Sequence, residues 1–266
     1  MAVCRFHKPS IDCWLFSLFL LIWYGITDVG LTTVHAGTTA AATYTVTFQA
    51  TWNANTHPQD FPLGAHFSPL IGATHNANVT FWNPDGLASV GIESMAELGT
   101  TTDLRRIIDE AREDGTALAV LSGSGTSSPG GVNFSFEIQQ SHPLVTLVTM
   151  IAPSPDWFVG IHGLSLFRDN QWVDRLVIDL LPYDAGTDSG VTFLSLNADT
   201  MPQEPIARLT DFPFLLGDTI LPLGTFTFQR EETCCMPGDV NGDGSITPAD
   251  AQCILRHFLA LSSCLQ

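Results

Sequence analysis

The chain of 266 residues has little positive charge. It carries 10 lysine and arginine residues against 27 aspartate and glutamate residues, for a net charge of −17, and Lys8 is its only lysine. Proteins that bind nucleic acid need clustered cations to contact phosphates, so this balance argues against nucleic acid as a partner. The same excess of carboxylates suits a protein that holds divalent cations.

Cysteine is missing from the main body of the chain. No cysteine lies between Cys13 and Cys234, so that part can form neither a disulfide nor a thiol-based site. Four cysteines cluster in the last 33 residues, namely Cys234, Cys235, Cys253 and Cys264. In an exported protein such a cluster can form two local disulfides, although the spacing does not select the pairs.

Long apolar runs are also scarce. Residues 13–26 form the one candidate, and this run is too short to span a bilayer well. It follows the basic residues Arg5 and Lys8 and precedes small residues at Val34-His35-Ala36, as in a secretory signal. We therefore predict a signal peptide over residues 1–36 and a secreted or cell-surface protein. An uncleaved N-terminal anchor is the alternative.

The rest of the chain has the composition of a folded β protein, with 45% hydrophobic and only 14% charged residues. Aromatic and β-branched residues alternate with polar ones over residues 44–52, which predicts a strand with one buried face. Further strands are predicted at residues 78–82, 117–121, 133–138, 144–151, 157–162, 176–181, 191–194 and 223–229. Glycine, proline, asparagine or aspartate separates nearly all of them, as in a β-sandwich or barrel.

One segment has helical spacing instead. Leu104, Ile107, Ile108 and Ala111 share one face of a helix predicted over residues 102–112. The glycine- and serine-rich residues 122–131 predict a flexible loop. The expected fold is mainly β, an antiparallel β-sandwich with one or two short helices.

The most specific local motif lies at residues 239–250. Calcium prefers six to eight hard oxygen ligands. Asp239, Asn241 and Asp243 supply them at loop positions one, three and five, and Gly244 permits the sharp turn at position six. The predicted Ca²⁺ shell is completed by Ser245, Thr247 and Asp250. A solvated acidic turn is the alternative.

This loop, with aspartate at its last position and a helix only after it, resembles the dockerin type I repeat. The resemblance covers residues 239–261 and implies a calcium-loaded module that binds cohesin, often in polysaccharide-degrading assemblies. Dockerins usually have two such repeats, whereas one is present here.

Three segments of the main body also share a pattern with a known family. They are residues 51–75, which contain His57, His66 and His75, the sequence SPDWFVG from residue 154, and PYDAGTDSG from residue 182. In this order and spacing they resemble the spondin N-terminal domain over residues 43–230, with residues 231–238 as a linker. The resemblance implies a non-enzymatic β-sandwich that holds calcium through Asp156, Asp184 and Asp188.

The residues themselves support a cation site there. Gly186 and Gly190 make the loop around Asp184 and Asp188 supple enough to bring both carboxylates to one point near Asp156. Converging carboxylates repel one another unless a cation neutralises them, and oxygen ligands without cysteine or histidine favour Ca²⁺ over Zn²⁺. Acidic surface turns are the alternative.

Nothing in the sequence predicts an enzyme. The nine-residue spacing of His57, His66 and His75 matches no compact metal motif, and no nucleophile elbow accompanies them. Glu93 and Glu97 could be imagined as a glycosidase pair, but that chemistry needs two carboxylates facing each other across a cleft. We expect Trp52, Trp82, Trp157 and Trp172 to be core or rim anchors.

Two functions follow. The first is a secreted, calcium-binding adhesion protein whose spondin-like domain binds an extracellular protein or carbohydrate, with membrane-surface contact left open. The second is a non-catalytic or accessory component of a polysaccharide-degrading assembly that docks to cohesin.

Overall fold

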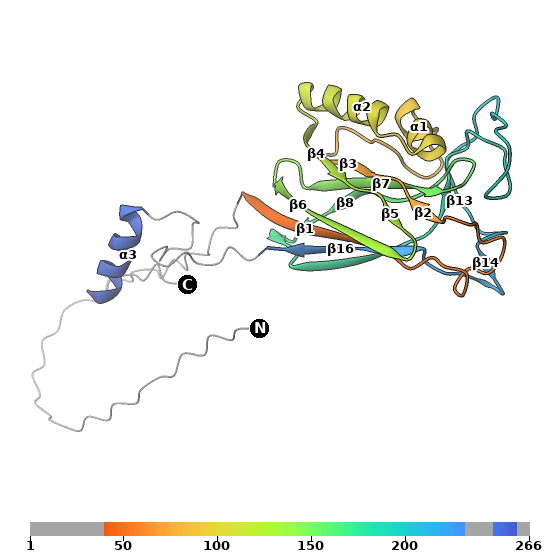
Figure 1. Cartoon of the computed structure of the whole chain (residues 1–266). Helices are drawn as coiled ribbons and strands as arrows, with labels where there is room; N and C mark the ends of the chain where they lie inside the picture. The colour runs from red at the N-terminus through yellow and green to blue at the C-terminus, as the bar shows by residue number, and fades with distance from the viewer. Residues whose placement is uncertain (1–39, 232–246, 260–266) are drawn as a thin grey trace, which may run out of the picture. The chain divides into compact units, whose positions relative to one another are not determined.

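The computed structural model describes residues 40–231 and 247–259. The predicted signal peptide, residues 232–238 of the linker, Cys234, Cys235, Cys264 and the loop residues Asp239, Asn241, Asp243 and Ser245 lie outside these ranges. Residues 40–231 form three layers, in which two antiparallel sheets pack face to face and two helices cover the outer face of one sheet (Figure 1). None of the described helices is long and apolar enough to cross a membrane.

The first sheet has the strand order β11 (Arg175–Leu180), β16 (Gly224–Arg230), β1 (Ala41–Ala50) and β6 (Gly130–Gln139), all antiparallel. In β1 the buried residues alternate with part-exposed or exposed ones, as the period of two predicts. Phe48 opposes Phe226, so aromatic side chains meet across strands on the inner face.

The second sheet is built around β7 (Leu144–Ala152). On one side of β7 lie β8 (Trp157–Ser165), β12 (Tyr183–Asp184) and β13 (Ala207–Arg208). On the other side, β3 (Leu70–His75) pairs with β4 (Ala117–Gly123), and β2 (His66–Phe67) pairs with β5 (Thr126–Ser127). Eight of the nine β7 residues are buried, because both faces of this central strand are covered.

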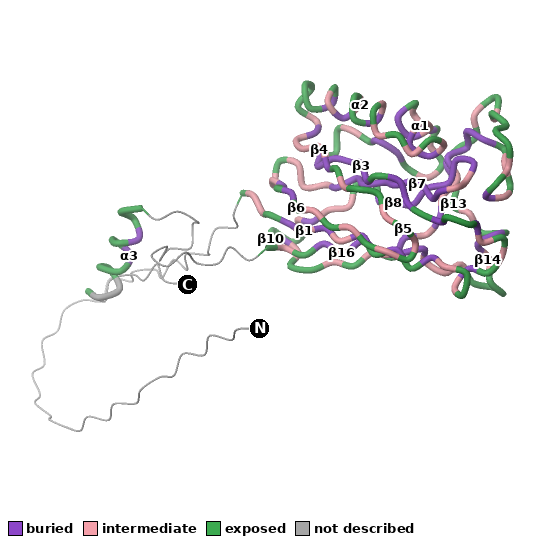
Figure 2. Tube along the Cα trace, viewed as in Figure 1, coloured by how far each residue is buried: buried purple, intermediate pink, exposed green. Residues whose placement is uncertain are grey.

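The helices α1 (Val90–Leu98) and α2 (Thr102–Glu113) form the third layer (Figure 2). The Ser89 hydroxyl caps α1 by accepting from the Ile92 N–H, and Gly99 ends it in a left-handed conformation. Ile92 and Ile108 belong to the core between the helices and the outer face of the second sheet. The apolar stripe predicted on residues 102–112 is therefore a packing face.

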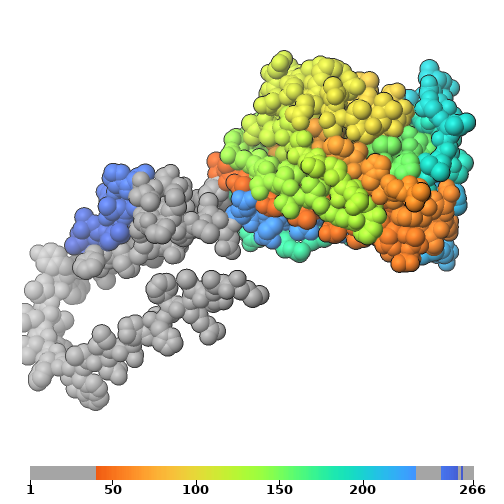
Figure 3. Space-filling model, viewed as in Figure 1, coloured from red at the N-terminus to blue at the C-terminus, as the bar shows by residue number. Residues whose placement is uncertain are grey.

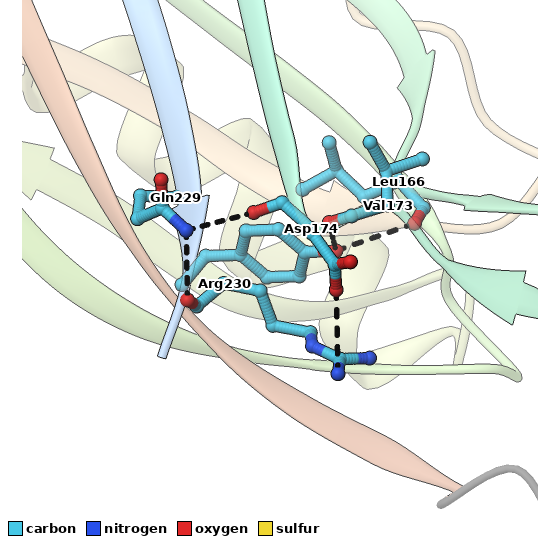
Figure 4. A network of polar contacts seen from close by, with 6 residues as sticks. Leu166, Val173, Asp174, Gln229 and Arg230 are labelled. Atoms are coloured by element: carbon cyan, nitrogen blue, oxygen red, sulfur yellow. Dashed lines mark hydrogen bonds and ion pairs between the residues drawn. The ribbon is translucent and has the colours of Figure 1, made fainter. Parts of the chain in front are cut away.

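Two small hairpins complete this part of the chain. They are β9 (Phe167–Arg168) with β10 (Gln171–Trp172), and β14 (Leu215–Leu216) with β15 (Thr219–Ile220). The buried Tyr44 hydroxyl donates to the Val173 carbonyl after β10, and Arg230 pairs with Asp174 at 3.3 Å (Figure 4). These contacts fix the first hairpin to the first sheet.

The C-terminal helix α3 (Pro248–Phe258) begins with reciprocal capping. The Thr247 N–H donates to Asp250 Oδ2 at 2.7 Å, and the Asp250 N–H donates to the Thr247 carbonyl at 3.1 Å. Asp250 is buried, and proline at the first helical position needs no hydrogen-bond partner for its nitrogen. The exposed side chains include Ile254, Leu255 and Leu259.

The structure confirms the antiparallel β-sandwich and the helix at residues 102–112, but three local expectations are wrong. Residues 78–82 and 191–194 are loops, in which Phe81, Trp82 and Phe193 are buried as loop anchors rather than as strand residues. Residues 122–131 are not one flexible loop, because β5 and the start of β6 lie within them and pair with other strands. Sequence patterning also missed α1.

Candidate functional site

Two of the three aspartates predicted to bind calcium lie side by side on neighbouring strands. Asp156 immediately precedes β8, and Asp184 ends β12, where it pairs with Trp157. The Ala185 N–H donates to the Asp156 carbonyl at 3.2 Å, which extends this pairing by one residue. Asp188 follows four residues later, in the loop that leaves β12.

The Asp156 carboxylate anchors that loop. It is fully buried, and its Oδ2 accepts from the Thr187 N–H at 2.8 Å, the Asp188 N–H at 3.1 Å and the Thr187 hydroxyl at 3.3 Å. Its Oδ1 is also buried and has no hydrogen-bond partner. Because an unpaired buried carboxylate oxygen is costly, this oxygen calls for a proton or a cation.

The other two aspartates bond to their own loop. Asp184 Oδ1 accepts from the Gly186 N–H at 2.7 Å. Asp188 is buried, with Oδ1 accepting from the Gly190 N–H at 2.7 Å and Oδ2 from the Ala198 N–H at 3.0 Å. Each carboxylate thus orders a turn, which explains the short Asp–x–Gly spacings of this segment.

Burial and crowding shift the acidity of these groups. Burial, together with the neighbouring Asp184 carboxylate, raises the pKa of Asp156 to about 6. Burial also raises the pKa of Asp184, and the Gly186 N–H opposes that rise. Two neighbouring carboxylates with raised pKa values are typical of a site where a bound cation would stabilise their ionised forms.

Glu97 of α1 adds a carboxylate that sequence reasoning did not assign to this site. Burial is the main cause that raises its pKa, the Thr187 side chain opposes the rise, and Glu93, Asp156 and Asp188 add to it. The helix that carries Glu97 was not predicted, so no sequence signal could place it beside residue 187. Glu93 faces Gln203 instead, whose Nε2 donates to Glu93 Oε2 at 3.3 Å.

As they stand, the carboxylates do not form a closed metal cage. Within residues 40–231 and 247–259, no three histidine, cysteine, aspartate or glutamate side chains converge closely enough to hold a metal ion. The reason is that both Asp188 oxygens are turned toward backbone N–H groups of the loop. The donor chemistry nevertheless fits a hard cation, because Asp156 Oδ1 and Asp184 offer oxygen without any nitrogen or sulfur ligand.

A buried aromatic cluster lies beneath this loop. Phe193 contacts Trp52, Trp157 and Phe214, with ring centroids 5.1–5.6 Å apart. These rings come from segments after β1, in β8, and in the two loops that follow β12. They hold the loops at this end of the sandwich to one another and to the core.

The tryptophans and histidines have structural surroundings. Trp52, Trp82, Trp157 and Trp172 are all buried, as expected of core anchors. His75 Nδ1 bonds the Asn76 carbonyl and Nε2 bonds the Thr146 hydroxyl, each at 2.8 Å, and burial lowers its pKa. His57 Nε2 bonds the Leu221 carbonyl at 3.2 Å, and burial lowers its pKa as well. The exposed His66 bonds the Gly64 carbonyl.

The sequence comparison gives the class of protein, a spondin-type extracellular domain. The spondin N-terminal family model, Spondin_N, matches residues 42–214. The chain belongs to the Spondin_N family.

Curated relatives agree with this assignment. The chain is 38% identical to human Spondin-2 over 181 residues, which cover 64% of this chain and 53% of that protein. It is 36% identical to chicken Spondin-1 over 195 residues, covering 70% of this chain and 24% of that protein. The chain thus spans about half the length of Spondin-2 and about a quarter of Spondin-1.

Membership of this family locates the protein outside the cell, as was predicted from residues 1–36. Its spondin relatives are non-enzymatic proteins of the extracellular matrix that act in adhesion. The matched region ends before the predicted calcium loop at residues 239–250, so the resemblance of that loop to dockerin stays a prediction.

Proposed function

We propose that this protein is a secreted, non-catalytic adhesion protein whose spondin domain binds an extracellular partner and uses Ca²⁺ to order its acidic loops. Asp156, Asp184 and Asp188 would hold the ion. Calcium would supply the positive charge that the crowded carboxylates lack, and it would have no chemical role in a reaction.

The observation that carries this proposal is the buried, unpartnered Oδ1 of Asp156 next to Asp184. A second supporting feature is the hydrogen bonding of the loop, because Asp156 Oδ2 already accepts from the backbone N–H groups of residues 187 and 188. An ion at Oδ1 would therefore act directly on the segment that carries Asp188.

We also propose a second calcium site in the tail, at Asp239, Asn241, Asp243, Ser245, Thr247 and Asp250. In support, Thr247 and Asp250 lie next to each other at the start of α3, where the Thr247 N–H donates to Asp250 Oδ2 at 2.7 Å. Docking of this tail to cohesin, as an accessory of a polysaccharide-degrading assembly, is the alternative function.

Calorimetric titration with Ca²⁺ tests both sites in the secreted protein. The triple variant Asp156→Asn, Asp184→Asn and Asp188→Asn is compared with Asp239→Asn and Asp250→Asn. We expect two sites in the wild type and one in each variant. If the triple variant binds as many calcium ions as the wild type, the spondin domain has no calcium site at these aspartates. A second titration, with cohesin in place of calcium, tests the alternative function.

The matched control for the triple variant is Asp109→Asn. Asp109 lies on the exposed face of α2 and pairs with Arg112 at 2.9 Å. Removing this charge also lowers the negative charge of the protein but touches neither proposed site. An equal loss of calcium binding in the control would mean that the ion binds through net charge alone.

A further inference from the structure

One end of the sandwich combines exposed apolar side chains with an excess of negative charge. This end, called the loop end below, comprises residues 51–69, 153–156 and 182–222. It contains seven of the eleven exposed large hydrophobic side chains of residues 40–231. They are Leu63, Val191, Leu194, Leu196, Met201, Phe212 and Leu216.

These side chains are strongly exposed. Leu63 is 99% exposed, Leu196 89% and Met201 85%. Scattered single apolar residues are normal on a protein surface, whereas larger groups of them are typical of interaction sites. By comparison, Val177 on β11 is the one exposed large hydrophobic residue on the strands of the two described sheets.

The segments that carry these residues lie together. Gln59 Nε2 donates to the Leu215 carbonyl at 2.7 Å, and Phe193 packs on Trp52 and Phe214. Figure 3 shows the loop after β1, the loop after β12 and the segment around β14 at the same end of the molecule. The buried aromatic cluster thus presents the apolar residues from a fixed base, which lowers the entropy lost on binding.

The charge of the loop end is one-sided. It contains eight carboxylates, and Arg208 is its only lysine or arginine. Five of the carboxylates are exposed, namely Asp60, Asp199, Glu204, Asp211 and Asp218, and none of the ion pairs found among the described residues uses them. A calcium ion at Asp156 would offset only part of this charge.

We infer that the loop end is a docking surface for a protein segment that presents apolar side chains flanked by lysine or arginine. The exposed leucines and methionine would be buried against the apolar side chains, and the exposed carboxylates would attract the cations and set the orientation. Phospholipid is the less suited occupant, because anionic headgroups would be repelled by the same carboxylates. The inference deepens the proposed binding function by naming its face.

The test uses three synthetic helical peptides as probes. One has a leucine face and a lysine face, the second has serine in place of leucine, and the third has glutamate in place of lysine. Binding to the secreted protein is measured at 150 mM salt, in calcium and in EDTA. We expect the leucine–lysine peptide to bind at least tenfold more tightly than either other peptide.

Protein variants then locate the surface. Leu194→Ser, Leu196→Ser and Met201→Ser together should weaken binding at least tenfold, whereas Val177→Ser should change it less than twofold. Asp199→Asn, Glu204→Gln and Asp211→Asn together should weaken it and flatten its salt dependence. Unchanged urea midpoints establish that the variants fold, since all these side chains are exposed.

Two results would overturn the inference. One is equal binding of the peptide to the wild type and to the serine triple variant. The other is binding of the wild type to phosphatidylcholine vesicles that the serine triple variant loses, which would make a membrane the occupant. Calcium titration is independent of both, because no substituted residue is a proposed ligand, so failure of the docking surface is distinguished from failure of the calcium site.

Discussion

Asp156 and Thr187 are 31 residues apart in the sequence and joined twice, since the Thr187 N–H and hydroxyl both donate to Asp156 Oδ2. One buried carboxylate therefore connects the start of β8 to the loop after β12. The same carboxylate has a free second oxygen. Its structural role and its proposed ion-binding role can be separated by substitution.

Asp156→Asn and Asp156→Ala should differ sharply. The asparagine oxygen can still accept from residues 187 and 188, and its NH₂ group can face Asp184 without charge repulsion. In EDTA we expect the asparagine variant to stay within about 1 kcal/mol of the wild type. Alanine leaves two buried N–H groups unpaired and should cost about 3 kcal/mol.

Urea unfolding in EDTA and in Ca²⁺ provides the measurement. Calcium at 100 times its dissociation constant should stabilise the wild type by about 2.7 kcal/mol and neither variant by a comparable amount. Equal stability of the alanine and asparagine variants in EDTA would contradict the anchoring role of Oδ2.

Gly186 offers a test of the loop backbone. It has a φ of +75°, and a Cβ there would lie 2.1 Å from the Glu204 carbonyl oxygen. Gly163 has a φ of +56° but no atom within 4 Å of its would-be Cβ. Gly186→Ala combines backbone strain with a collision, whereas Gly163→Ala has the strain alone.

We expect Gly163→Ala to cost about 1 kcal/mol and Gly186→Ala to cost at least twice as much in the free energy of unfolding. Gly186→Ala should also weaken calcium binding, because Asp184 Oδ1 accepts from the residue 186 N–H. Thermal unfolding and calcium titration measure the two effects. Similar costs for both substitutions would mean that the loop moves away from residue 204 freely.

Sequence patterning predicted the part of the fold that has a local physical cause. In β1, buried and exposed residues alternate, and in α2 the buried residues have helical spacing. Each pattern arises because a single element packs one of its faces on the core. The loop anchors Trp82 and Phe193 misled the prediction, since local alternation cannot distinguish a half-buried strand from a loop with one buried ring. α1 was missed because its apolar pattern is short and includes Gly91. This glycine is needed for close helix packing, since a Cβ there would lie 2.7 Å from the Leu104 Cα of α2.

The candidate site was predictable in composition but not in geometry. The spondin-like spacing predicted Asp156, Asp184 and Asp188 as ligands, and pairing of β8 with β12 brings the first two together. The approach of Glu97 depends on packing of a helix onto the second sheet, and the turn of Asp188 toward residues 190 and 198 depends on a long loop. Both are tertiary relationships that no short sequence window contains.

The aromatic base of the loop end can be tested with two phenylalanines of the same region. Phe193 is buried between Trp52, Trp157 and Phe214, whereas Phe212 is 51% exposed. Phe193→Ala should cost about 3–5 kcal/mol, because it removes a large side chain from a packed core. Phe212→Ala should cost less than about 1 kcal/mol.

Urea unfolding measures both costs, and limited proteolysis reports where the structure opens. Cleavage within residues 189–204 should rise in the Phe193→Ala variant well before global unfolding. If cleavage rises equally in the Phe212→Ala variant, the aromatic cluster does not hold this loop.

Tyr44 gives the protein a predictable response to alkaline pH. Its hydroxyl donates to the Val173 carbonyl, and burial raises its pKa to about 12, with Arg230 opposing and Asp174 adding to the rise. The unfolded chain loses this proton near pH 10. The contribution to stability is therefore complete below pH 10 and is lost as the pH rises from 10 to 12.

Over that interval the wild type should lose about 2 kcal/mol of unfolding free energy more than Tyr44→Phe, which itself should cost about 1–2 kcal/mol at neutral pH. The interval has few competing titrations, because Lys8 is the only lysine and lies in the predicted leader. In a secreted Tyr183→Phe variant, Tyr44 is the remaining tyrosine, since Tyr24 also lies in the leader. Its absorbance at about 295 nm should then rise near pH 12 rather than near pH 10, and a rise at pH 10 in the folded protein would show that the Tyr44 hydroxyl is not held by Val173.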